Sequence, residues 1–153
     1  MSCQCFLDLF PVEILHNLFT YFLAHEILLS FTDLSNYIND VLLSYSNWQL
    51  NLKSIRRDHF DLVCYHIQPE KVIWLILSDD IDTPGQSELF FSRFHIEQFI
   101  HLQFLTLIKI EYESLKNIFF NLNKLKQLKS LSFELYSITH KYLPSCNSIR
   151  HTK

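Results

Sequence analysis

The sequence predicts an α+β fold, in which a small three-helix module precedes an open array of three or four short parallel strands backed by helices. Three observations lead to this prediction. Apolar residues recur at three- and four-residue intervals up to about residue 45, alternate with polar ones from residue 48, and then form one leucine pattern three times. The 153 residues are 48% hydrophobic, which is enough apolar material for a core.

The N-terminal module begins at Pro11-Val12-Glu13, which suits a first helical turn because proline needs no amide partner there. The apolar residues that follow, as far as Phe22, fall on one helical face. Two further runs repeat this spacing, from Ile27 to Leu34 and from Ile38 to Tyr45. We therefore predict three short helices packed into a compact module.

The second part of the chain alternates strand and helix. Apolar and polar residues alternate from Trp48 to Leu52, as in a half-buried strand. Helical spacing returns between Ile55 and Ile67, and Pro69 ends that segment. The apolar run from Val72 to Leu77 is typical of a buried strand.

One pattern recurs at Val72-x-x-Leu75-x-Leu77, Leu102-x-x-Leu105-x-Leu107 and Leu128-x-x-Leu131-x-Phe133, and Leu50-x-Leu52 fits a shortened fourth copy. The central leucines at 75, 105 and 131 are 30 and 26 residues apart, and residues 115–122 supply a helical face between the last two strands. These units resemble leucine-rich repeats, whose stacked units each supply one parallel strand and one helix. The asparagine or cysteine usual after the strand is replaced by Asp80, Ile110 and Tyr136, so no asparagine ladder is expected.

The alternative to a repeat array is an ordinary α/β domain whose strands are rich in leucine. The repeat requires parallel pairing, and antiparallel hairpins at Leu50, Leu75, Leu105 and Leu131 would exclude it. The leucines of a repeat strand point into the core and alternate residues point outward. We therefore predict a concave, substrate-binding face; its members are Trp74, Ile76, Phe104, Thr106 and Ile108, continued by Ser130, Ser132 and Glu134. Burial of these side chains under a neighbouring loop is the open alternative.

Within residues 9–43 the motifs Phe10-Pro11-Val12-Glu13-Ile14, Leu18-Phe19-Thr20-Tyr21-Phe22 and Glu26-Ile27-Leu28 follow one another. This segment resembles an F-box, whose pattern is Leu-Pro-x-Glu-Ile, Ile-Phe-x-Tyr-Leu and Asp-Leu-Leu. The departures are Phe10 and Phe22 for leucine, Glu26 for aspartate, and the absence of a tryptophan in the third helix. An F-box directly before leucine-rich repeats is a known domain order.

The resemblance implies an F-box substrate receptor of an SCF-type ubiquitin ligase complex, in the Ubl conjugation pathway. Its helices would dock on a Skp1-like adaptor and through it on a cullin, while the repeats bind an unknown protein substrate. Carried over position by position, it assigns five residues to the adaptor-facing surface: Pro11, Ile14, Leu15, Leu18 and Leu28. The alternative is a leucine-rich-repeat scaffold that binds protein with no ubiquitin-ligase role.

Motif content argues against catalysis, cofactors and metals. The chain has one glycine, Gly85, whereas phosphate-binding loops and nucleophile elbows are built on glycine. Cys3-x-Cys5 has no second pair to complete a zinc site, and Cys64 is expected to be an inert core thiol. The net charge of −3 gives no bulk attraction to nucleic acid, although the lysines between 109 and 129 would suit an acidic partner or simply form a solvated face. We predict a non-catalytic adaptor.

The four cysteines show no disulfide framework, and no basic leader begins the chain, so we expect a reducing intracellular compartment, cytoplasmic or nuclear. The longest uncharged apolar stretches are shorter than the roughly 18 to 20 residues of a membrane span, so no membrane association is expected. The predicted domains are an F-box over 6–46, a partial repeat region over 47–136 and a polar, disordered tail over 137–153. The last repeat lacks a cap, and we expect its leucine row to be partly exposed.

Overall fold

The computed structural model describes residues 5–135, so the tail predicted over 137–153 lies outside the described residues. The fold is mixed α+β. Its first part consists of η1 (Phe6–Leu9), α1 (Val12–Phe19), α2 (Ala24–Phe31) and α3 (Asn36–Ser44). The second part consists of β1 (Trp48–Asn51), α4 (Arg57–His66), η2 (Pro69–Lys71), β2 (Val72–Ser78), α5 (Gln86–Arg93), η3 (Ile96–Gln98), β3 (Phe104–Ile108), α6 (Tyr112–Asn121), η4 (Leu122–Lys124) and β4 (Ser130–Glu134).

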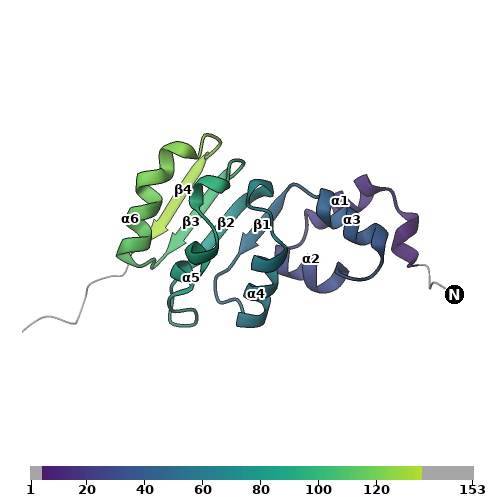
Figure 1. The fold of residues 1–153 in the computed structure, drawn as a ribbon, viewed down its shortest axis with the longest axis horizontal. Coiled ribbons are helices and arrows are strands. Elements are labelled where there is room, and N and C mark those ends of the chain that lie inside the picture. The colour runs from purple at the N-terminus through teal and green to yellow at the C-terminus, as the bar shows by residue number, and fades with distance from the viewer. Residues whose placement is uncertain (1–4, 136–153) are drawn as a thin grey trace, which may run out of the picture.

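The strands form one four-stranded sheet in chain order, β1-β2-β3-β4, with the N-terminal helices at one end and α6 at the other (Figure 1). Every neighbouring pair is parallel, and the register places Leu50, Leu75, Leu105 and Leu131 in one row. Parallel neighbours require a crossover, which α4, α5 and α6 provide in turn. The predicted parallel pairing of these leucines is confirmed.

The leucine rows build the core of the sheet. Leu75 and Leu105 are fully buried, and they belong to one cluster with Phe60 of α4, Phe90 of α5 and Ile118 of α6. The three crossover helices therefore cover the leucine face of the sheet. Full burial of each such side chain stabilises the fold by about 1.5 to 3 kcal/mol.

The core does not stop between the helical module and the sheet. A single cluster of buried side chains runs from Leu15 in α1 to Leu125 beyond α6. At the junction, the rings of Tyr45 and Trp48 meet edge to face with centroids 5.1 Å apart. Helix α2 packs against both α4 and β1, so the first and second parts share packing surface.

Helix α5 was not predicted from the sequence. Its first residues carry no apolar periodicity, and the helix begins after Gly85, whose φ of 69° is accessible to glycine at little cost. An aromatic cluster stabilises α5. The centroid of the Phe90 ring lies 5.0 Å from that of Phe94 and 5.7 Å from that of Phe99. Tertiary packing therefore places a helix where local pattern is weak.

Candidate interaction surfaces

Helix α1 presents two apolar stripes. Leu15 and Phe19 point into the core, whereas Ile14 and Leu18 are 51% and 38% exposed. Residues four apart share a helical face, and neighbouring residues differ by about 100°, so each stripe is continuous and distinct from the other. Pro11, just before α1, is also exposed. The outer stripe is not needed for the core of the described chain and is a candidate interaction surface.

Two of the five predicted adaptor-facing residues are core residues. Leu15 is 1% exposed and Leu28 is 2% exposed, so neither side chain belongs to the outer surface of the helices. The structure corrects the prediction for this pair, because both side chains lie on the inward faces of their helices. Pro11, Ile14 and Leu18 remain accessible.

The helical module exposes more apolar side chains than sequence reasoning identified. Besides α1, the exposed large apolar residues of this part are Phe6, Leu9, Tyr21, Phe22, Leu29, Leu34 and Leu43. The signal was present in the sequence, since a helix with apolar residues beyond one stripe cannot bury all of them against one neighbour. Large apolar side chains are therefore exposed on several elements of the module and not on α1 alone.

Polar contacts fix the helices that carry this surface. His16 Nε2 lies 3.2 Å from the Val41 carbonyl oxygen and 3.1 Å from Ser44 Oγ, which ties α1 to the end of α3. The Tyr37 hydroxyl donates to the Phe10 carbonyl at 2.7 Å, joining α3 to the segment before α1. These hydrogen bonds hold α1 in place relative to α3, and with it the exposed stripe of Ile14 and Leu18.

The open face of the sheet gathers most of the predicted substrate-binding residues. The register sets Trp74 beside Phe104 and Ile76 beside Thr106. Phe104 is 42% exposed, and the other three side chains are half-buried. Four predicted residues are thus together on one face, with apolar groups in the middle of the sheet.

Ile108 does not contribute to this face. Its side chain is 9% exposed, and it lies beside the fully buried Ser78 at the carboxyl end of its strand. The loop after β2 closes this end, where the amide of Asp79 donates to the Ile108 carbonyl at 3.0 Å. For Ile108 the prediction of exposure is wrong, since its side chain is buried.

A buried carboxylate at the same end of the sheet was missed by sequence reasoning. Asp79 accepts hydrogen bonds from the amide of Ser87 at 2.7 Å, from the Ser87 hydroxyl, and from the amide of Glu111 at 3.1 Å. It therefore joins the loop after β2, the start of α5 and the loop after β3. The available signal was the pair Asp79-Asp80 directly after an apolar strand, but the comparison with leucine-rich repeats directed attention to Asp80.

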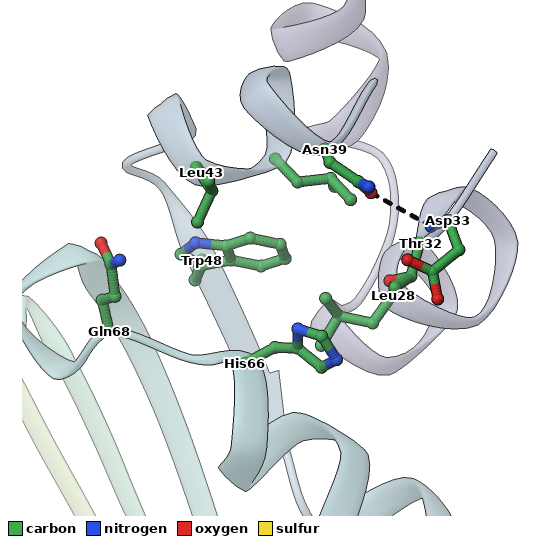
Figure 2. Close-up of a pocket in the computed structure, with 9 residues that line it drawn as sticks. Leu28, Thr32, Asp33, Asn39, Leu43, Trp48, His66 and Gln68 are labelled. Carbon is green, nitrogen blue, oxygen red and sulfur yellow. Dashed lines mark hydrogen bonds between the residues drawn. The ribbon is translucent and has the colours of Figure 1, made fainter. Parts of the chain in front are cut away.

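A cavity of about 220 Å³ lies at the junction between the helical module and the sheet (Figure 2). Its apolar wall consists of Leu28, Leu42, Leu43 and Trp48, which come from α2, α3 and β1. The predicted adaptor residue Leu28 thus faces a cavity inside the fold. Its polar residues are Thr32 and Asp33 between α2 and α3, Asn39 of α3, His66 at the end of α4, and Gln68 just after that helix.

Within residues 5–135, no group of three or more histidine, cysteine, aspartate or glutamate side chains is placed to hold a metal ion. None of the described helices combines the length and apolar character needed to cross a membrane. Comparison with protein-family models, with curated proteins and with solved structures finds no match to this chain.

Proposed function

We propose that this chain is a non-catalytic substrate receptor of the F-box type. Its helical module docks on a Skp1-like adaptor, and through it on a cullin, while the open face of the sheet binds a protein substrate. The observation that carries the proposal is the exposed stripe of Ile14 and Leu18, on a module whose inner stripe already completes the core. The Pro11-Val12-Glu13 motif at the start of this helix supports the F-box assignment.

The energetics favour docking through α1. Full burial of an isoleucine or leucine side chain is worth about 1.5 to 3 kcal/mol, and Ile14 and Leu18 retain a large exposed area to bury. Binding energy concentrates in a few apolar anchors on rigid elements, and α1 is fixed to α3 through His16.

The sheet face suits a protein ligand for a related reason. Trp74 and Phe104 are adjacent in register, and aromatic residues are enriched at the centres of interfaces. Gln49 and Ser130 occupy the same row on the outer strands, so polar groups border the apolar centre. An apolar centre with a polar rim is the usual anatomy of an interface.

A binding assay with purified Skp1 tests the docking role. The double variant Ile14→Asp with Leu18→Asp places two charges in the proposed contact without touching the core, and we expect binding to fall by more than about 100-fold. Ile81→Asp, a similar change at an exposed loop residue far along the chain, is the matched control and should bind as the unaltered chain does. Circular dichroism checks folding. Undiminished binding by the double variant would remove the role assigned to α1.

The second candidate is a protein-binding scaffold with no ubiquitin-ligase role. The sheet face favours this candidate because it lies on β2 and β3, away from the stripe on α1. It could therefore bind a protein ligand without an adaptor bound to α1. In that case the unaltered chain shows no affinity for Skp1, and Phe104→Asp still abolishes capture of the protein ligand. The Skp1 assay therefore separates the two candidates.

A further inference from the structure

The cavity at the junction of the module and the sheet has a size suited to one side chain. Its volume is about 220 Å³, below the roughly 300 to 1,000 Å³ of sites for complete small-molecule ligands. Figure 2 shows Thr32, Asp33 and Asn39 together at one end, Gln68 at the other and Trp48 between them. His66 lies between these ends, below Trp48 and beside Leu28, so the wall between the polar ends combines apolar side chains with one imidazole.

An unsatisfied hydroxyl marks one polar end. Thr32 Oγ1 is shielded from solvent and has no hydrogen-bond partner among the described residues. Shielded polar atoms are nearly always hydrogen-bonded in folded proteins, because leaving one unpaired is unfavourable. The hydroxyl oxygen is therefore available to accept a hydrogen bond from an incoming group.

Asp33 adds a negative charge at this end. No ion pair joins its carboxylate to a cation within residues 5–135. Its backbone has a φ of 61°, which is uncommon for a residue other than glycine, and its amide donates to Asn39 Oδ1 at 3.1 Å. The turn between α2 and α3 thus holds an unpaired carboxylate beside an unpaired hydroxyl.

The remaining wall suits an aliphatic stem. Leu28, Leu42 and Trp48 are all buried and line the cavity, and no lysine or arginine is among its described lining residues. Arginine combines an apolar stem with a planar cationic head that donates several hydrogen bonds and stacks on aromatic rings. The guanidinium only donates hydrogen bonds, so it needs acceptors around it. Thr32 Oγ1 and the Asp33 carboxylate are such acceptors.

We infer that this cavity binds an arginine side chain of a partner protein. The guanidinium faces Asp33 and Thr32, and the stem lies against Leu28, Leu42 and Trp48. The chain's net charge of −3 adds a weak general attraction for a basic partner. The site is separate from the α1 stripe and from the sheet face, so it stands whether or not the chain binds a Skp1-like adaptor.

The test uses two probes that differ in charge and hardly in shape, N-acetyl-arginine N-methylamide and its citrulline counterpart. Binding to the full chain is followed by NMR at the Trp48 indole N–H and the Asn39 side-chain amide. We expect saturable shifts with a Kd on the order of 1 to 10 mM for the arginine probe, as suits a ligand of this size. The citrulline probe should bind at least about fivefold more weakly because it cannot form the ion pair.

Asp33→Asn is the decisive variant, because asparagine tolerates the same left-handed backbone. It should weaken the arginine probe by about five- to tenfold and remove the preference over citrulline. Asp40→Asn removes an equal charge from α3 at a residue that does not line the cavity, and should change nothing. No saturable shift up to about 50 mM, equal binding of the citrulline probe, tighter binding of the matching lysine probe, or an equal effect of Asp40→Asn would each overturn the assignment.

Discussion

At the scale of single residues, Asp79 shows how much one buried carboxylate can organise. It is 5% exposed and accepts hydrogen bonds from Ser87 at the start of α5 and from the Glu111 amide after β3. Charge-assisted hydrogen bonds of this kind are stronger than neutral ones, and a donor left unpaired in a buried site is costly. The residue therefore ties the segments after two consecutive strands, β2 and β3, to the start of α5.

Replacing Asp79 with alanine should lower the free energy of unfolding by about 2 to 5 kcal/mol, because the amides of Ser87 and Glu111 lose their acceptor. Urea denaturation followed by circular dichroism measures the change. Asp82→Ala in the same loop is the control: Asp82 is exposed and accepts only a long hydrogen bond from Ser54, so its loss should cost less than about 0.5 kcal/mol. Equal effects of the two variants would show that Asp79 is not a structural tie.

Burial also affects Cys64, whose thiol becomes unreactive toward alkylating reagents. Burial raises the pKa of its thiol to about 11, against the opposing effect of the Arg93 guanidinium. Only the thiolate attacks alkylating reagents, so at pH 8 its thiolate fraction is about 100-fold below that of a thiol with a pKa of 9. Iodoacetamide labelling read by mass spectrometry should therefore modify the half-buried Cys5 long before Cys64. Equal labelling rates in the folded chain would contradict this.

At the scale of elements, the four strands are not equally covered. Leu77 and Leu107 are fully buried, whereas Phe133, in the same row of β4, is 52% exposed. Leu131 is also less buried than Leu75 and Leu105. The Phe119 ring of α6 meets that of Phe133 edge to face at 6.1 Å, which shelters one side of it only. Among the described strands, β4 thus gains least from hydrophobic burial.

Amide hydrogen exchange tests this difference in burial between β4 and the other strands. Amides of residues 130–134 should exchange at least about tenfold faster than those of 104–108, because local opening costs less where less apolar surface is buried. Leu125, which was expected to be partly exposed, is buried, so fast exchange should begin after it. Exchange as slow in β4 as in β3 would mean that β4 is as well protected as the strand before it.

The same scale shows what sequence can and cannot predict. Periodicity located α1 to α4, α6 and all four strands, because each has an apolar face that must be buried. It did not locate α5, which depends on the aromatic cluster around Phe90. Periodicity also does not show which of two apolar stripes on a helix is buried. Both Leu15 and Ile14 were predicted to face the adaptor, whereas Leu15 is a core residue and Ile14 is exposed. Ile108 follows the same alternation as the half-buried Thr106 and yet is buried, so alternation along a strand does not fix exposure at its end.

At the scale of the whole molecule, the shared core couples the helices to the sheet. His25 of α2 stacks on His59 of α4 with ring centroids 5.8 Å apart, directly across this junction. Burial lowers the pKa of His25; the Glu26 carboxylate raises it, and His59 lowers it further. Protonation of His25 would place a positive charge on a partly buried ring at this interface.

Stability should therefore fall on acidification. Because the folded-state pKa of His25 lies below the unfolded value of 6.5, the unfolded chain binds the proton first, and stability is lost as pH drops from about 7 through 6.5 to the folded pKa. The melting temperature at pH 5.5 should be lower than at pH 7.5, and His25→Gln should reduce the difference. His101→Gln, at an exposed residue far from the junction, should leave it unchanged. A pH dependence untouched by His25→Gln would assign it to other groups.

The order of the strands has a consequence for how the chain is made. Each strand pairs only with the one before it and the one after it in sequence. During synthesis, every new strand therefore finds its partner already outside the ribosome, with the helical module the first surface on which β1 can pack. None of the described strands needs a partner that is synthesised much later. The leucines exposed after each strand has formed are covered by the helix and strand that are synthesised next. The growing chain thus carries one temporary apolar edge, which moves from β1 to β4 as the described strands are added in turn.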